Sequence, residues 1–258
     1  MIPILFDSSW LKIYSYPLFI GLAWGTGFSY FIFLLEKFQL DQRGMKVLFI
    51  LNFFVAWIGA KIFFLIYSSG EYFEKLASSS SFWLGGGFVF YGGLIFSILF
   101  SLFYCLILKR CSANSLIAFL PALTLGHGIG RIGCFFSGCC FGRPLDSSYF
   151  WSIKIHHVYR HPAQLYEALG LFLLTFWLYK MLSRDKKKTL GLVLFYLLGY
   201  SILRFFIEFY RGDKIRGIHG SLSTSQILSL TIICICLMGG TLYLRLKNGR
   251  LRDSSMKI

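Results

Sequence analysis

The sequence predicts an all-α integral membrane protein, a single domain over residues 1–258 with seven transmembrane helices. Its composition points there: 56% of the residues are hydrophobic, only 14% are charged, and the mean hydropathy is +0.66. Because soluble domains carry about 25% charged residues, this chain has too few to cover a surface that faces water. The same composition excludes a soluble enzyme, a disordered protein and a small secreted disulfide scaffold.

Seven apolar stretches are long enough to cross a bilayer, whose hydrocarbon core takes about 20 helical residues. They cover residues 16–35, 47–67, 88–108, 115–136, 163–182, 189–208 and 225–245. The fourth stretch is rich in glycine, and the second and sixth contain charged residues. We find no soluble domain, long linker or internal repeat between them.

The positive charges between the stretches predict how the chain is oriented. Of the 26 Lys and Arg residues, 15 lie at the end of or after stretches one, three, five and seven, 8 lie on the opposite side and 3 fall in the interior of stretches. Since Lys and Arg are enriched on the cytoplasmic side, the C-terminus is expected in the cytoplasm and the N-terminus outside. We attribute the net charge of +15 to anchoring and to contact with anionic membrane lipid, and expect no nucleic acid partner.

Four polar residues form one stripe along the end of the sixth stretch: Tyr200, Arg204, Glu208 and Arg211. At about 100° per residue, their spacing keeps them within about 80° of one another on a helix. A charge in mid-bilayer costs about 2.5–3.5 kcal/mol, so this face is expected to line a polar cavity. Because Glu208 balances only one of the two arginines, the stripe predicts an anionic ligand. A structural ion-pair ladder between helices is the alternative.

A glycine-rich segment at residues 126–144 contains Arg131. Its Gly128-x-Gly130-x-x-Gly133 spacing matches a dinucleotide fingerprint only formally, because it follows an apolar helix and no βαβ unit surrounds it. We interpret the glycines as sites of close helix packing or close ligand approach. Arg131 is then a candidate for bidentate recognition of phosphate.

Three cysteines lie in or beside the same segment: Cys134, Cys139 and Cys140. Their C-x4-CC spacing matches neither the C-x2-C pattern of zinc sites nor the redox motif of the same spacing. No metal and no cofactor is therefore expected. The seven cysteines of the chain are an odd number, and a disulfide framework is not predicted.

Two further segments carry candidate residues. Residues 161–167 place His161, Gln164 and Glu167 at the start of the fifth stretch, where Glu167 needs a cationic partner. Glu167 is a candidate either for direct chemistry or as a buried partner of an arginine. Tyr91, flanked by glycines at the start of the third stretch, is either an interfacial aromatic residue or part of a site.

These segments, taken in this order, resemble the prolipoprotein diacylglyceryl transferase family. The resemblance covers nearly the whole chain through motifs at residues 13–16, 59–61, 90–95, 130–133, 161–167, 204–211 and 225–229. It implies a multi-pass protein of the bacterial cytoplasmic membrane. It also implies transfer of the diacylglyceryl group from phosphatidylglycerol to the lipobox cysteine thiol of a preprolipoprotein, with release of glycerol 1-phosphate.

The resemblance also implies roles for individual residues. The arginine of the G-R-x-G signature corresponds to Arg131, and the arginine that begins R-F-x-x-E-F-x-R corresponds to Arg204. The catalytic candidates are Arg131, Arg204, Tyr91 and His161. The candidates for binding phosphatidylglycerol are Arg131, Arg204, Glu208, Arg211, Tyr200, Gln164 and Glu167.

The chain departs from the family pattern where protons are handled. Tyr91 stands where better-known members have His, and a tyrosine with a reference pKa of about 10 is a poor base. The family's Asn, Asn and Glu after the G-R-x-G signature are replaced by Cys134, Ser137 and Cys139. Proton transfer by His161, proton transfer by Glu167, and a reaction without a protein base all stay open.

Two alternatives remain beside this function. One is a diverged paralogue that uses another acceptor or only binds lipid. The other is a small-solute transporter, because charged residues within the membrane also mark transport paths. Against a transporter, the two halves of the chain show no matching pair of interrupted helices.

Overall fold

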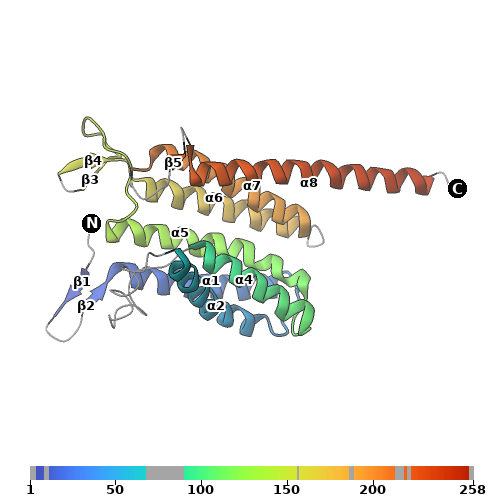
Figure 1. Cartoon of the computed structure of the whole chain (residues 1–258). Coiled ribbons are helices and arrows are strands. Elements are labelled where there is room, and N and C mark those ends of the chain that lie inside the picture. The colour runs from blue at the N-terminus through green and yellow to red at the C-terminus, as the bar shows by residue number, and fades with distance from the viewer. Residues whose placement is uncertain are drawn as a thin grey trace. The chain divides into compact units, whose positions relative to one another are not determined.

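The computed structural model is mostly helical (Figure 1). It describes residues 4–8, 12–67, 90–155, 157–185, 189–212, 218–219 and 222–255. By their contacts the residues divide into two compact units. The first combines Met1–Phe31 with Ile117–Ile258, and the second is Ile32–Leu116.

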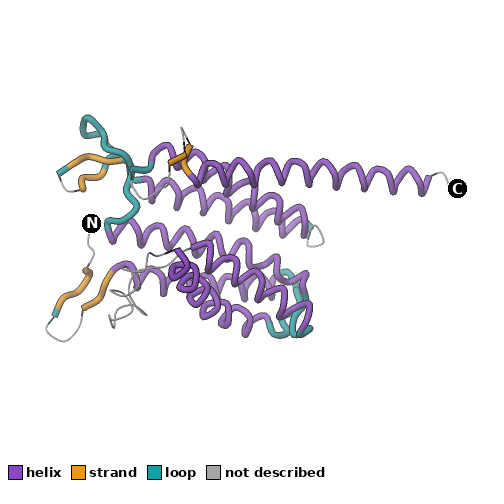
Figure 2. The backbone as a smooth tube through the Cα atoms, in the orientation of Figure 1, coloured by secondary structure: helices purple, strands orange, loops and turns teal. Residues whose placement is uncertain are grey.

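The first unit is built from long helices that pack along one another. Its helices are most of α1 (Ser15–Lys37), then α5 (Phe119–Ser137), α6 (Ala163–Arg184), α7 (Thr189–Tyr210) and α8 (Thr224–Ser255). Helix α6 packs against both α5 and α7, and α7 packs against α8 (Figure 2). Gly128 of α5 permits the close approach of α6, since a Cβ there would lie 2.5 Å from Cε1 of Phe172.

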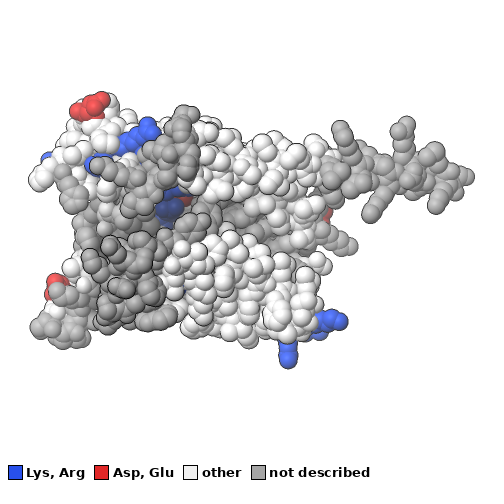
Figure 3. All heavy atoms as spheres, viewed as in Figure 1, with Lys and Arg blue, Asp and Glu red and all other residues white. Residues whose placement is uncertain are grey.

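Helix α6 is apolar on its outward face and on most of its inward face, where Gln164, Glu167 and Thr175 are the buried polar residues. Leu171, Leu178 and Leu182 are buried in the bundle, whereas Phe176 and Trp177 are about half exposed. Figure 3 shows a broad helical surface almost without Lys, Arg, Asp or Glu. A helix with apolar residues all round belongs in a large core or in a membrane, so this outer surface suits contact with lipid.

Within the described part of the chain, three short antiparallel hairpins flank these helices, and the sequence did not predict them. They pair β1 (Ile4–Asp7) with β2 (Lys12–Tyr14), β3 (Ile153–Ile155) with β4 (Val158–Arg160), and β5 (Ile218–His219) with β6 (Leu222–Ser223). Each hairpin ends directly before or close to a helix. The second strand of each hairpin leads into the helix that follows it, α1, α6 or α8.

The second unit is a helical hairpin of α2 (Met45–Tyr67) and α4 (Phe90–Leu102), which continues as a π-helical turn η1 (Phe103–Ile107). A 3-10 helix η2 (Ala113–Ala118) then leads into α5. Nδ2 of Asn52 on α2 donates to Oγ of Ser101 on α4 at 2.9 Å. Cys105 and Cys111 form a disulfide, a pairing that the cysteine arithmetic did not predict.

The helices agree closely with the apolar stretches of the sequence. Within the described residues, six helices are long and apolar enough to cross a membrane, and Gly92–Ile107 is a shorter apolar helix. The shorter helix corresponds to the third stretch, of which residues 88–89 lie outside the described residues. The prediction of a mostly helical, multi-pass membrane protein is confirmed.

Candidate functional site

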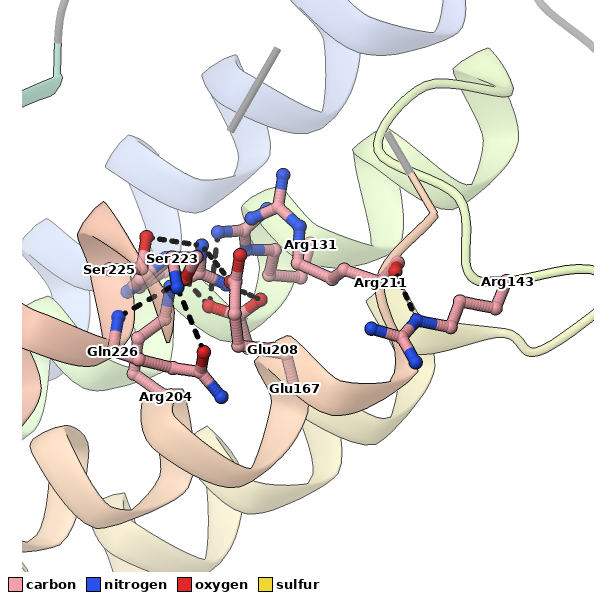
Figure 4. A network of polar contacts seen from close by, with 10 residues as sticks. Arg131, Arg143, Glu167, Arg204, Glu208, Arg211, Ser223, Ser225 and Gln226 are labelled. Atoms are coloured by element: carbon pink, nitrogen blue, oxygen red, sulfur yellow. Dashed lines mark hydrogen bonds and ion pairs between the residues drawn. The ribbon is translucent and has the colours of Figure 1, made fainter. Parts of the chain in front are cut away.

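Four charged side chains meet inside the first unit, between α5, α6 and α7 (Figure 4). Oε1 of Glu167 on α6 is 3.0 Å from Nη2 of Arg131 on α5, and its Oε2 is 3.6 Å from Nη1 of Arg204 on α7. Nη2 of Arg204 lies 3.0 Å from Oε2 of Glu208, one turn further along α7. The charged face of α7 is therefore directed into the helix bundle.

Both carboxylates of this cluster are nearly sealed from solvent. The side chains of Glu167 and Glu208 are 2% and 1% exposed, and those of Arg131 and Arg204 are 16% and 13% exposed. A buried charge without a partner costs several kcal/mol, so the arginines are what allow the carboxylates to stay in an apolar bundle. This favours Glu167 as a buried partner of arginine over Glu167 as a group that does chemistry itself.

Among the described residues, each arginine has a buried nitrogen that makes no hydrogen bond, although Nη1 of Arg204 is within ion-pair distance, 3.6 Å, of Oε2 of Glu167. These nitrogens are Nε of Arg131 and Nη1 of Arg204. Arg211 lies within electrostatic range of Glu167, so three cations stand against the two carboxylates of Glu167 and Glu208. Arg131, Arg204 and Arg211 together exceed the charge of Glu167 and Glu208 by one, and the planar forks of the arginines suit an oxyanion such as a phosphate.

The aromatic rings of Tyr200 and His127 lie at the edge of the charged cluster. The ring of Tyr200 packs against that of His127 with centroids 5.5 Å apart, and Nε2 of His127 is 4.0 Å from Oε1 of Glu167. Tyr200 thus neighbours the ion pairs through His127, to which the sequence analysis assigned no role. The sequence did contain an indication that His127 lies near the site, because it precedes Arg131 by four residues and so shares its face of α5.

Helix α8 adds a contact that the sequence analysis missed. Oγ of Ser225 accepts a hydrogen bond from Nη2 of Arg204 at 3.1 Å. The start of α8 is set by a capping box: N of Ser223 donates to Oε1 of Gln226 at 3.0 Å, and N of Gln226 donates to Oγ of Ser223 at 3.2 Å. The S-x-x-Q pattern was the available signal for placing Ser225 in a first helical turn.

The loop after α5 is tied to the start of α6 and to the end of α7. N of Gly142 donates to the carbonyl of His161 at 3.1 Å, and N of Arg143 donates to the carbonyl of Tyr210 at 2.8 Å. Nε of Arg143 also donates to the carbonyl of Arg211 at 3.2 Å. These bonds hold the loop after α5, the start of α6 and the end of α7 together.

Gly142 has no room for a side chain at this junction. A Cβ there would lie 2.6 Å from Cβ of His161 and 2.8 Å from the carbonyl oxygen of Tyr210. We expect Gly142→Ala to lower stability by about 1–3 kcal/mol, the usual cost of overpacking. The measurement is thermal unfolding in detergent. Gly21→Ala is the control, because nothing lies within 4 Å of its Cβ position, and equal unfolding temperatures for both variants would contradict the expectation.

His161 stands just before α6, beside the aromatic rings of Tyr166 and Tyr210. Its Nδ1 is 3.4 Å from the hydroxyl of Tyr166, and its ring centroid is 5.2 Å from that of Tyr210. Burial lowers the pKa of His161 below its usual 6.5, so the ring is neutral near pH 7 and able to accept a proton. None of the hydrogen bonds or ring contacts described for His161 reaches the charged cluster.

Two other predicted residues take different places. Gln164 is 1% exposed, and its Nε2 donates to the carbonyl of Cys139 at 2.6 Å. It therefore binds the loop after α5, one helix turn before Glu167. The side chain of Tyr91 lies outside the described residues, so its role stays a prediction.

The three cysteines around this loop come together in space. The Sγ atoms of Cys134, Cys139 and Cys140 all lie within 4.8 Å of one another. Oγ of Ser137 lies 3.4 Å from Sγ of Cys139. The C-x4-CC spacing matched neither the zinc pattern nor the redox motif, so the convergence of these thiols was not predicted.

Comparison with known proteins gives consistent matches over the length of the chain. A sequence model of the family described as prolipoprotein diacylglyceryl transferase matches residues 3–242. A phosphatidylglycerol–prolipoprotein diacylglyceryl transferase of Clostridium tetani is 34% identical over 248 residues, covering 91% of this chain and 95% of the relative. A second, from Clostridium perfringens, is 36% identical over 90% of each chain, and one from Finegoldia magna is 30% identical over 86% and 88%.

Proposed function

Because this chain belongs to the prolipoprotein diacylglyceryl transferase family, we propose that it transfers the diacylglyceryl group of phosphatidylglycerol to a lipobox cysteine. The acceptor is the cysteine thiol of a preprolipoprotein, and the reaction is the first step of lipoprotein maturation. A thioether bond forms between sulfur and a glycerol carbon, the bond from that carbon to the phosphate oxygen breaks, and glycerol 1-phosphate leaves.

The buried cationic cluster is the observation that carries this function. Displacement at the glycerol carbon places growing negative charge on the phosphate, and donors aimed at that charge stabilise the transition state. Arg131 is assigned to the phosphate because its buried Nε–H makes no hydrogen bond within the described residues. Arg204 is assigned to it because its Nη1 makes no hydrogen bond there either and lies only within ion-pair distance, 3.6 Å, of Oε2 of Glu167. Arg211 lies within electrostatic range of Glu167 and adds a third positive charge to the site.

The other lipid-binding candidates support these arginines. Glu167 and Glu208 orient the two guanidinium groups, at 3.0 Å each for the shortest contacts. Tyr200 packs against His127 at the edge of the cluster, and Gln164 fixes the loop after α5. Their contribution is to hold the phosphate site in one geometry before the lipid arrives.

The nucleophile comes from the substrate, because the thiolate of the lipobox cysteine is the reactive form. Of the groups considered for its proton, Glu167 is engaged by two arginines. We assign the proton to His161, which is neutral near pH 7. Tyr91 keeps the role of a catalytic candidate that touches the substrate.

This assignment makes a prediction about pH. Since the pKa of His161 lies below 6.5, the transfer rate should fall as the pH drops through that pKa and the ring becomes protonated. His161→Gln should lower the rate and remove this acid limb. The measurement is the pH profile of initial rates with a lipobox peptide. An unchanged acid limb in the variant would exclude His161 as the proton acceptor.

The membrane arrangement belongs to the same proposal. We place the chain in the bacterial cytoplasmic membrane as one transferase domain with seven spans, the third formed by α4 and η1, the N-terminus outside and the C-terminus in the cytoplasm. Cysteine accessibility tests the orientation. In intact cells, a membrane-impermeant thiol reagent should label one more cysteine than in the parent protein when a cysteine is introduced at Ser8, and no more when it is introduced at Arg43, the parent's own exposed Cys139 and Cys234 serving as the baseline.

A direct assay decides between this function and its alternatives. The protein is reconstituted with phosphatidylglycerol and a lipobox peptide, and the expected result is a peptide heavier by one diacylglyceryl group with equimolar glycerol phosphate. A peptide with Ser in place of the lipobox Cys should stay unmodified. Lipid binding without product would favour the diverged lipid-binding relative, and solute flux in vesicles without product would favour a transporter.

A further inference from the structure

The end of α5 brings three thiols into one cluster. Cys134 lies in the last turn of the helix, and Gly138 ends the helix in a left-handed conformation with φ of 74°. N of Cys139 then donates back to the carbonyl of Cys134 at 3.2 Å, and Cys140 also has a positive φ of 55°. The helix cap folds the chain back on itself, so a C-x4-CC spacing yields three neighbouring sulfur atoms.

The spacing of these sulfur atoms is close to that of a metal tripod. All three lie within 4.8 Å of one another, and a tetrahedral zinc with Zn–S bonds of about 2.3 Å needs sulfurs about 3.8 Å apart. Cys139 is exposed and Cys140 is partly exposed, so rotation of their side chains can close the remaining distance. Cys134 is buried and provides the fixed member of the set.

Within the described part of the chain, the cluster offers three protein ligands. Among the described residues, it contains no His, Asp or Glu beside the three cysteines. Structural zinc sites are closed by four protein ligands, whereas catalytic sites have three and leave one position open. A soft cation held by these three thiolates would have one coordination position open to a further ligand.

An independent observation places an uncompensated polar atom beside the cluster. The amide of Gln164 donates to the carbonyl of Cys139 at 2.6 Å, but its Oε1 is buried and makes no hydrogen bond within the described residues. Cys134 also lies three residues after Arg131, on the same face of α5. The thiols and the phosphate-binding arginine are thus about one helix turn apart.

We propose that Cys134, Cys139 and Cys140 bind one thiophilic divalent cation of the zinc class, and that its open position binds the thiol of the acceptor peptide. The second half rests on the proposed function. On coordination the acceptor thiol loses its proton, which passes to His161, and the resulting thiolate attacks the glycerol carbon. The S–C bond forms as the C–O bond breaks, and glycerol 1-phosphate takes the bonding electrons.

The metal site is tested by binding alone. The reduced full-length protein is freed of metal with a chelator and titrated with Zn²⁺, and with Co²⁺ as a coloured probe for thiolate ligands. We expect one ion per chain and thiolate-to-cobalt charge-transfer absorption. Cys139→Ser and Cys140→Ser, at the more exposed positions, should each weaken binding at least about 10-fold, whereas Cys234→Ser should not change it.

Two outcomes would overturn the metal site. One is equal Zn²⁺ stoichiometry in the wild-type protein and in a Cys134→Ser, Cys139→Ser, Cys140→Ser triple variant. The other is a disulfide between two of the three cysteines in protein purified under the reducing conditions of the titration. Thermal unfolding of each variant shows whether a loss of binding merely reflects a loss of fold.

The open position is tested with the acceptor. A lipobox peptide should shift the charge-transfer absorption of the Co²⁺-loaded protein, and the same peptide with Ser in place of Cys should not. Full transferase activity of the chelator-treated protein would overturn this half of the proposal. If metal binds and the peptide shifts the spectrum but no diacylglyceryl is transferred, the proposed function fails while the site stands.

Discussion

Replacing Arg131 with alanine lowers the rate of diacylglyceryl transfer by about 10²–10³-fold, the loss expected when one donor to a developing oxyanion is removed. Glu167 holds one nitrogen of this guanidinium at 3.0 Å, while its buried Nε makes no hydrogen bond among the described residues. The guanidinium group is thus held in place, and its Nε–H stays available to a ligand. Because the phosphate gains charge in the transition state, the loss should fall on kcat more than on KM.

Two variants separate this effect from a general disturbance. Arg131→Lys keeps the charge but loses the planar fork, so its rate should lie between those of the wild type and Arg131→Ala. Arg43→Ala removes an arginine with a side chain that is 87% exposed, and its rate should equal that of the wild type. Unfolding temperatures identify any variant that is misfolded, and a folded Arg131→Ala protein with the full rate would contradict the phosphate assignment.

Replacing Glu167 with glutamine destabilises the protein by about 3–5 kcal/mol, because it leaves two buried guanidinium groups without their shared counter-ion. Arg131 and Arg204 reach this carboxylate from different helices, at 3.0 Å and 3.6 Å. Both side chains are mostly buried, at 16% and 13% exposed, so water compensates the lost charge only in part. The measurement is thermal unfolding in detergent at low ionic strength.

Two control variants should lose less stability than Glu167→Gln. Glu208→Gln removes a carboxylate that pairs with Arg204, which still has Glu167 as a second partner, so its loss of stability should be smaller. Asp41→Asn breaks an exposed pair with Arg43 and should leave the unfolding temperature unchanged. A Glu167→Gln protein as stable as Asp41→Asn would show that the carboxylate does not hold the helices together.

Helix period predicted one half of the site well. The spacing of Arg204 and Glu208 placed them on one face of a helix, and the structure joins them at 3.0 Å. The need of Glu167 for a cation followed from its depth in an apolar stretch, and it has two. Such inferences succeed because neighbours within one helix are set by sequence separation alone.

Contacts between different helices could not be predicted from sequence spacing. The partners of Glu167 lie 36 and 37 residues away in sequence, on helices whose rotation about their axes is set by packing. Ser225 joins Arg204 only because α7 and α8 lie side by side. The three thiols converge because Gly138 ends α5 in a left-handed turn, a local geometry that motif spacing does not encode.

By itself, the sequence determined that this protein is a multi-pass membrane protein, where its helices run, and which few charges cannot face lipid. These properties follow from composition and from periodicity along a single helix, where hydrophobic free energy dominates. Only the tertiary structure decided that Glu167 bridges Arg131 and Arg204, and that Cys134, Cys139 and Cys140 form one cluster. Ion pairs and ligand sites depend on atoms brought together from distant segments, because Coulomb energy in an apolar interior changes steeply with distance and burial.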